Sequence, residues 1–342
     1  MDVEKSVYGI LEDGQPVHIF KITTDSGMVA EVLTYGATIA SLKVPDREGK
    51  LRDVVLGYDD LNGYLHNHGH IGTIAGRYAN RIGKARFSID GEEFRLKANN
   101  GENNLHGGPG GLDKAIWKAR EFMEKDRAGV ILSYLSKDGE AGFPGNLETE
   151  IVYSFSNNGE WIIEYLAKTD KPTHVNLTQH AYFNLNGGKR DILDEILQID
   201  AKTTTEVNSQ LIPTGVLKDI SDGSSDFSKP KSIGQDILRT GGYDLNYVPE
   251  KGPGLSKVAS AFDKESGIKM DVLTTEPGLQ LYTANHFNGF TGKGGTRYTK
   301  HYGVCFETQH FPDSPNRPEF PSTLLRPGQE YRSKTVYKFS VQ

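Results

Sequence analysis

Residues Glu150 to Lys168 read EIVYSFSNNGEWIIEYLAK, two runs rich in β-branched and aromatic residues around a turn. The first run is Glu150 to Phe155 and the second is Trp161 to Lys168. Between them stands Asn157-Asn158-Gly159, and asparagine and glycine adopt the left-handed backbone that a tight hairpin needs. The segment therefore predicts two adjacent antiparallel strands.

The same period-two pattern recurs along the chain. Phe87-Ser88-Ile89 and Phe94-Arg95-Leu96 flank Asp90-Gly91, which predicts a second hairpin. Further expected strands are Val130 to Leu135, Leu279 to Thr283, and Thr335 to Val341, the last with Thr335, Tyr337, Phe339 and Val341 on one face. Helical periodicity is almost absent, and only Ile233 to Leu238 suggests a turn or two. We expect an all-β protein built as one large antiparallel β-sandwich.

Length and composition narrow the class of protein. The chain has 342 residues, and its Pro-Gly and Gly-Gly pairs are scattered rather than gathered into a linker, so we expect a single domain over residues 1–342. A net charge of −6 argues against nucleic-acid binding, which needs clustered Lys and Arg. No apolar run resembles a signal peptide or a bilayer span, so no membrane partner is expected. The lone Cys305 precludes an intramolecular disulfide, and a cytoplasmic location fits that best.

Four short segments combine titratable groups with glycines and aromatic residues. They are GRYANRI at 76–82, NLHGG at 104–108, QHAYFNL at 179–185 and FETQ at 306–309. Two histidines, an arginine and a glutamate supply acid–base chemistry without a cofactor or a metal. The sequence therefore predicts one site assembled from distant parts of the chain.

His180 and Glu307 are the candidates for proton transfer. Histidine changes charge near neutral pH, although a lone histidine is more often a buried side chain bonded to backbone. Glu307 follows an apolar run, where a carboxylate is costly unless it is paired or functional; the alternative is an exposed glutamate with a cross-strand Lys or Arg. Burial would raise its pKa from about 4.3, and a neighbouring carboxylate would raise that of His180.

Other residues have plain structural alternatives. His106 precedes Gly107-Gly108 and could equally sit on a flexible surface loop. Arg81 offers a fork of donors suited to hydroxyls, whereas Arg77 is expected to form an ion pair that holds a loop. Asp244 after two glycines would otherwise be a turn residue.

Taken in chain order, the four segments resemble the aldose 1-epimerases, or galactose mutarotases, from about Val7 to the C-terminus. The resemblance implies a mutarotase-like supersandwich, with His180 as general acid and Glu307 as general base. It assigns sugar binding to five positions: Asn80, Arg81, His106, Asp244 and Gln280. One departure is Leu245, where the family commonly has a histidine after the aspartate.

This resemblance implies that the chain interconverts the α and β anomers of free hexoses such as galactose and glucose, without a cofactor. Its expected partner is the small hexose alone, with the chain a monomer or a weak homodimer. The alternatives are a non-catalytic carbohydrate-binding sandwich, a hexose-6-phosphate epimerase, and a glycoside hydrolase, which would need a second carboxylate such as Asp244. The preferred hexose is not determined by the sequence.

Some patterns are given no role in the predicted site. His66, His68 and His70 alternate, and such spacing on an extended segment could bind zinc, but the flanking Asn67 and Gly69 favour a solvent-exposed loop. We therefore expect no metal. Gly292 to Thr296 lacks the spacing of a phosphate loop and is expected to be a hairpin turn, and Phe287 is expected to pack in the core.

Overall fold

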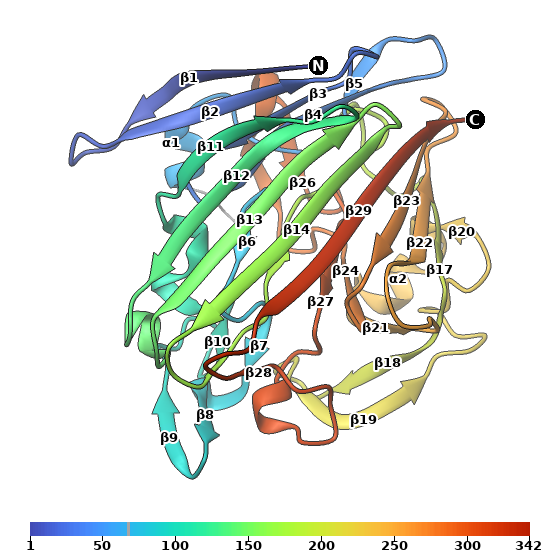
Figure 1. Cartoon of the computed structure of the whole chain (residues 1–342). Helices are drawn as coiled ribbons and strands as arrows, with labels where there is room; N and C mark the ends of the chain where they lie inside the picture. Colours follow the sequence, from blue (N-terminus) through green and yellow to red (C-terminus); the bar gives the residue numbers. More distant parts are fainter. Residues whose placement is uncertain (67–68) are drawn as a thin grey trace.

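The computed structural model describes residues 1–66 and 69–342 and consists mainly of antiparallel β-sheets (Figure 1). The largest sheet has nine strands, in the order β11 (Lys118–Met123), β12 (Arg127–Ser136), β13 (Leu147–Ser156), β14 (Glu160–Thr169), β29 (Tyr331–Val341), β23 (Ile268–Thr274), β22 (Ser256–Phe262), β17 (Ile196–Ile199) and β20 (Lys231–Ser232). All its neighbouring strands run antiparallel. The predicted all-β sandwich is confirmed.

The two predicted hairpins are both present. β13 pairs with β14 from Leu147↔Thr169 to Phe155↔Trp161. In the second hairpin, β8 (Arg86–Ile89) pairs with β9 (Glu92–Arg95). Asp90 and Gly91 at its turn have φ of 52° and 87°, the left-handed backbone expected of a two-residue loop.

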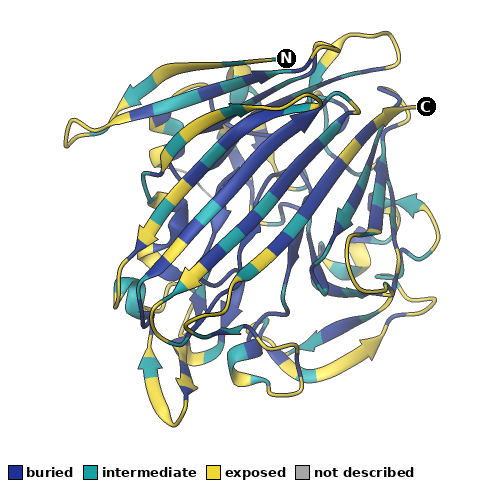
Figure 2. Ribbon diagram, viewed as in Figure 1, coloured by how far each residue is buried: buried dark blue, intermediate teal, exposed yellow. Residues whose placement is uncertain are grey.

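Two five-stranded sheets accompany the large one. The first contains β1 (Asp2–Ile10), β2 (Pro16–Thr23), β3 (Val29–Leu33), β4 (Thr38–Pro45) and β5 (Leu51–Asp53), and it lies across the upper ends of β11 to β14 in Figure 1. The second has the order β19 (Pro213–Asp219), β18 (Ala201–Val207), β21 (Asp244–Pro249), β24 (Gly278–Tyr282) and β27 (Cys305–Gln309). Buried apolar residues from all three sheets form one core, which includes Phe20, Tyr153, Leu279, Phe306 and Tyr337. Figure 2 shows this burial along the middle of β13 and exposure on β1 and the outer loops.

The second five-stranded sheet has one face for the core and one for polar groups. Side chains alternate along a strand, so Phe306 and Thr308 point to one side of β27 and Glu307 to the other. On the core side, Tyr337 of β29 donates a hydrogen bond of 2.8 Å to the carbonyl of Phe306, and the hydroxyls of Thr308 and Thr335 lie 2.5 Å apart. These contacts with the large sheet turn Glu307 to the opposite face.

Four pairs of short strands connect the loops around the large sheets. They are β6 (Ile74–Ala75) with β16 (Thr178–Gln179), β7 (Arg81–Ile82) with β10 (Asn104–Leu105), β15 (Thr173–His174) with β28 (Leu324–Leu325), and β25 (Asn288–Thr291) with β26 (Arg297–Thr299). The last pair encloses Gly292 to Thr296, which confirms the predicted hairpin turn. Thr178 of β16 donates to the carbonyl of Thr308 at 2.8 Å, so β16 lies against β27.

Helices are few and short. They are α1 (Leu61–Leu65) and α2 (Ile237–Thr240), and α2 with the 3₁₀ turn Ile233–Gln235 matches the helical turns expected there. The other 3₁₀ turns are Gly83–Ala85, Gly108–Gly110, Leu112–Lys114, Glu140–Gly142, Lys293–Gly295 and Ser314–Asn316. Within the described residues, no helix has the length and apolar character needed to cross a bilayer.

Candidate active site

Glu307 occupies the centre of β27, every residue of which is buried. Its side chain faces Gln280 across the strand pair, and Oε2 has no hydrogen-bond partner among the described residues. Burial, and then the negative charge of Asp244, raise the pKa of Glu307 to about 8, while the nearby Arg81 acts in the opposite direction. The carboxyl is therefore mostly protonated at neutral pH, and it is not the exposed, ion-paired glutamate that was the alternative.

His180 follows β16 directly and is held by its backbone. Its N–H donates to the carbonyl of Thr73, and its own carbonyl accepts from Gly72, both at 2.9 Å. Nε2 lies 3.6 Å from Oε1 of Glu307, and Nδ1 lies 3.6 Å from the sulfur of Cys305. The two predicted proton-transfer groups thus lie side by side.

The predicted upward pKa shift of His180 is wrong. The side chain is 4% exposed, and burial, with the positive charge of His70 as a smaller cause, lowers its pKa to about 3. The prediction assumed an ionised carboxylate beside the ring. Because Glu307 keeps its proton, desolvation of the imidazolium dominates instead.

His106 and Asn80 lock each other in place. The backbone N–H of His106 donates to the backbone carbonyl of Asn80 at 3.0 Å. The backbone N–H of Asn80 in turn donates to Nδ1 of the His106 ring at 3.1 Å. His106 is 5% exposed, so the alternative of a flexible surface loop is wrong. The glycine that follows His106 allows two backbone segments to pack closely, because a Cβ on Gly107 would lie only 2.0 Å from the carbonyl oxygen of Gly76.

Arg81, Asp244 and Gln280 form a polar chain next to Glu307. A guanidinium nitrogen of Arg81 lies 3.6 Å from Oδ2 of Asp244, and Nε of Arg81 donates to Asn100 at 3.1 Å. The amide of Gln280 donates to Oδ1 of Asp244 at 2.6 Å. Gln280 is not among the described residues that line the cavity, and its side-chain amide contacts the carboxylate of Asp244.

These side chains surround a cavity of about 370 Å³, within the size range of small-ligand sites. Its lining consists of Gly69, His70, Asn80, Arg81, Asn100, Leu105, His106, His180, Tyr182, Asp244, Tyr282, His286, Phe287, Asn288, Phe290 and Glu307. Phe287 packs in the core as predicted, with its ring 4.7 Å from that of Tyr182, and it also contributes to this wall. A face of aromatic rings beside clustered polar groups suits a sugar, which has apolar and hydroxyl-bearing sides.

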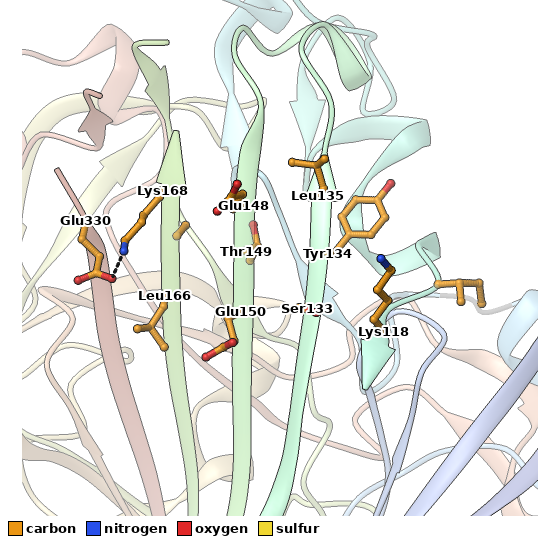
Figure 3. Close-up of a pocket in the computed structure, with 12 residues that line it drawn as sticks. Lys118, Ser133, Tyr134, Leu135, Glu148, Thr149, Glu150, Leu166, Lys168 and Glu330 are labelled. Atoms are coloured by element: carbon orange, nitrogen blue, oxygen red, sulfur yellow. Dashed lines mark ion pairs between the residues drawn. The ribbon is translucent and has the colours of Figure 1, made fainter. Parts of the chain in front are cut away.

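A wider depression of about 610 Å³ lies elsewhere, on the outside of β12 to β14 (Figure 3). Its charged groups include Glu148, Glu150 and the ion pair of Lys168 with Glu330 at 3.5 Å. No histidine is among the described residues that line it. The adjacent histidine and glutamate therefore lie in the smaller cavity, not in this depression.

Sequence reasoning missed His70 and Tyr282 as cavity residues, whereas Tyr182 belongs to the aromatic segment after His180 that was placed in the site. His70 was expected on an exposed loop, but its Nδ1 lies 3.0 Å from Asp113 and its ring lies 4.8 Å from that of His106. His66 stands at the exposed end of α1, with Nδ1 bonded to the carbonyl of Asn62, so it is not on an extended segment. His68 lies outside the described residues.

Arg77 lies outside the cavity lining. Its guanidinium donates to the hydroxyl and carbonyl of Ser136 and to the carbonyls of Lys137 and Pro144, at 2.8–3.0 Å. It holds a loop as predicted, but the expected ion pair is wrong, because all four bonds end on neutral oxygens.

Among the described residues, one group of possible metal ligands consists of His106, His180 and Glu307, whose ligand atoms lie within 4.8 Å of one another. Nδ1 of His106 accepts the amide of Asn80, so the neutral ring carries its proton on Nε2. That nitrogen is a donor toward the cavity and has no free lone pair for a metal. The residues in this arrangement suit proton transfer and hydroxyl binding better than metal ligation.

Comparison with known proteins agrees with this geometry. The profile of the aldose 1-epimerase family matches residues 18–338. Galactose mutarotase of Bos taurus is 40% identical, covering 100% of this chain and 99% of the relative, and aldose 1-epimerase of Escherichia coli K12 is 36% identical over 96% of each.

Solved structures show the same architecture. An aldose epimerase homologue from C. elegans superposes with a TM-score of 0.88 at 30% identity, covering 94% of this chain and 98% of the other. Galactose 1-epimerase of Lactobacillus acidophilus NCFM also gives a TM-score of 0.88, at 25% identity and 99% coverage of each chain. The β-sandwich with its enclosed acid–base pair is thus that of a sugar isomerase. The chain belongs to the aldose 1-epimerase family.

Proposed function

We propose that the enzyme interconverts the α and β anomers of free hexoses, galactose and glucose foremost, with Glu307 as general base and His180 as general acid. The observation that carries the proposal is the 3.6 Å separation of Nε2 of His180 and Oε1 of Glu307 inside a small, mostly buried cavity. Two adjacent groups of opposite role are what ring opening requires.

The proposed reaction has two proton transfers in each direction. The base removes the proton of the C1 hydroxyl while the acid delivers one to the ring oxygen, which breaks the bond between C1 and that oxygen. The aldehyde rotates about the C1–C2 bond, and the former ring oxygen attacks the other face. The two side chains exchange roles during closure, so the enzyme returns to its starting state.

The two pKa values indicate which group of the pair holds the proton before the sugar binds. With Glu307 at about 8 and His180 at about 3, the free pair holds one proton at neutral pH, mainly on the carboxyl. The productive arrangement, a carboxylate beside an imidazolium, contains the same number of protons. Substrate binding therefore has to shift one proton from Glu307 to His180, against the difference between their two pKa values, and both limbs of the pH profile belong to the pair.

The remaining polar residues are proposed to hold the sugar. Asn80, Arg81, His106 and Asp244 line the cavity and bear donors or acceptors for hydroxyls. Gln280 is proposed to act through Asp244, whose carboxylate it orients by its 2.6 Å hydrogen bond.

The alternative functions have weaker support. A binding module needs no paired acid and base. A glycoside hydrolase would use Asp244 as the second carboxylate, but this side chain is shared between Arg81 and Gln280. A hexose-6-phosphate epimerase needs extra cations, and Arg81 is the only Lys or Arg among the described residues that line the cavity.

The test is proton NMR of freshly dissolved α-D-galactose and α-D-glucose with purified protein. We expect the β-anomer signal to grow faster than in buffer, and Glu307→Gln and His180→Ala to abolish the acceleration. Relaxation at the buffer rate with the wild-type protein would refute the proposal.

The remaining expectations form part of the same proposal: one domain over residues 1–342, a cytoplasmic location, no cofactor, and a monomer or weak homodimer. Sedimentation with and without galactose measures the oligomeric state directly.

A further inference from the structure

His70 presents a nitrogen to the cavity, and a contact on the far side of the ring fixes which tautomer its neutral form adopts. Its Nδ1 lies 3.0 Å from Oδ2 of Asp113, a residue only 6% exposed. A carboxylate can only accept, so Nδ1 carries the proton. In the neutral ring, Nε2 then has a free lone pair, and no described residue donates to it.

The backbone around His70 is also fixed. Its carbonyl accepts from the amide and the hydroxyl of Thr73 at 3.1 and 3.0 Å, and the carbonyl of Gly69 accepts from Tyr182 at 2.8 Å. His70 itself has a φ of 58°, in the left-handed region. The ring is therefore placed by its neighbours and does not need a ligand to order it.

His106 presents the complementary atom. Its Nδ1 accepts the amide of Asn80, so its Nε2 bears a hydrogen toward the cavity. The rings of His70 and His106 lie 4.8 Å apart and are tilted by 60°. One wall of the cavity thus carries a donor and an acceptor side by side.

We propose that a single hydroxyl of the bound sugar bridges this wall, accepting from Nε2 of His106 and donating to Nε2 of His70. A hydroxyl group both donates and accepts, whereas a hydrogen substituent at the same carbon can do neither. His70 is then a specificity-determining residue that selects aldoses bearing this hydroxyl. The inference rests on the proposed epimerase function of the same cavity.

Two substitutions separate the bridging role from a structural one. His70→Asn keeps a donor near the position of Nδ1 for Asp113 and tolerates a positive φ, but it removes Nε2. His70→Gln places an amide near the position of Nε2. His66→Asn is the matched control, since His66 is exposed outside the cavity.

The experiment measures kcat/KM for anomer exchange of galactose and glucose and of analogues lacking the hydroxyl at C2, C3, C4 or C6. With the wild-type enzyme, loss of the bridged hydroxyl should lower kcat/KM about tenfold or more, because the buried His106 and the partly buried His70 both lose their partner. His70→Asn should lower kcat/KM about tenfold for the parent sugar. In this variant, removing the bridged hydroxyl from the sugar should cause no comparable further loss. His70→Gln should recover part of the activity, and His66→Asn should match the wild type.

Each other outcome has a distinct meaning. An equal loss for every sugar in both His70 variants would make His70 merely structural and overturn the inference, as would no loss at all. If both variants fail to fold, a wild-type enzyme indifferent to all four hydroxyls still overturns it. A wild-type enzyme that accelerates no aldose instead refutes the proposed function itself.

Discussion

Replacing Glu307 by glutamine should make the protein inactive but more stable in alkaline solution. The carboxyl is 2% exposed, and burial together with Asp244 raises its pKa from 4.5 to about 8. At roughly 1.4 kcal/mol per pH unit, that difference corresponds to about 5 kcal/mol. This value is the free-energy cost, at high pH, of burying Glu307 where its ionised form is disfavoured.

The direction in which the free energy of unfolding changes with pH follows from proton binding to Glu307 in the folded and the unfolded chain. Below pH 4.5 both the folded and the unfolded chain hold the proton, and the stabilisation from this group is fully present. Between pH 4.5 and about 8 only the folded chain holds it, so the free energy of unfolding falls as the pH rises. Above about pH 8 both states are ionised and the loss levels off. Glutamine has no such proton, so Glu307→Gln lacks this slope.

The assay is urea unfolding of wild type and Glu307→Gln at pH 5, 6, 7 and 8. The stability difference in favour of the variant should grow across this range toward a few kcal/mol, since about 5 is the upper value. Glu195, whose pKa burial also raises to about 8, contributes equally to both proteins and cancels. Exposed Glu12→Gln is the matched control and should show a constant difference.

The catalytic activity of Glu307→Gln is the second measurement. Glu307→Gln should lower kcat by about 10²–10⁴-fold, the usual contribution of a general base. Stability curves of variant and wild type that stay parallel from pH 5 to 8 would mean that Glu307 is ionised in the folded protein, and would refute the reasoning.

Four further predictions concern the same cavity. His180→Ala should lower kcat by about 10²–10⁴-fold with an unchanged circular dichroism spectrum; a loss below tenfold would contradict its role as acid. For the wild type, kcat/KM should be level around neutral pH and fall above about pH 8, where the pair loses its one proton; a rate still rising at pH 9 would contradict this. Arg81→Ala and Asp244→Ala should mainly raise KM, measured by NMR exchange, and activity should survive exhaustive dialysis against EDTA, whereas loss restored by zinc would reveal a metal.

The fold was predictable wherever local pattern and turn chemistry agreed. The Glu150 to Lys168 segment forms its hairpin as predicted because its alternation and its Asn-Gly turn point to the same structure. The two-residue strands β7 and β16 were not predictable, because two residues contain no period. Yet these strands place Arg81 and His180 beside the polar face, so their pairing depends on contacts between distant segments.

The sequence identified most residues of the candidate site but not the contacts that hold them in place. His106 was identified, but its burial and its tautomer depend on Asn80 through two backbone contacts that spacing does not reveal. His70 was missed because Gly69 made its segment look like a surface loop. Its turn into the cavity depends on Asp113, which is 43 positions away in the chain.

The pKa of His180 shows why the identity of neighbours is insufficient to predict the chemistry. A carboxylate 3.6 Å away would stabilise an imidazolium, and proximity to Glu307 alone therefore suggests an upward shift. The same burial that surrounds His180 also keeps Glu307 protonated, which removes the negative charge on which that argument depends. Desolvation then acts on both groups in the direction of neutrality, raising one pKa and lowering the other. The pair consequently consists of two neutral groups with one titratable proton, held by the carboxyl, and the proposed ring opening requires that a bound sugar favour its transfer to His180.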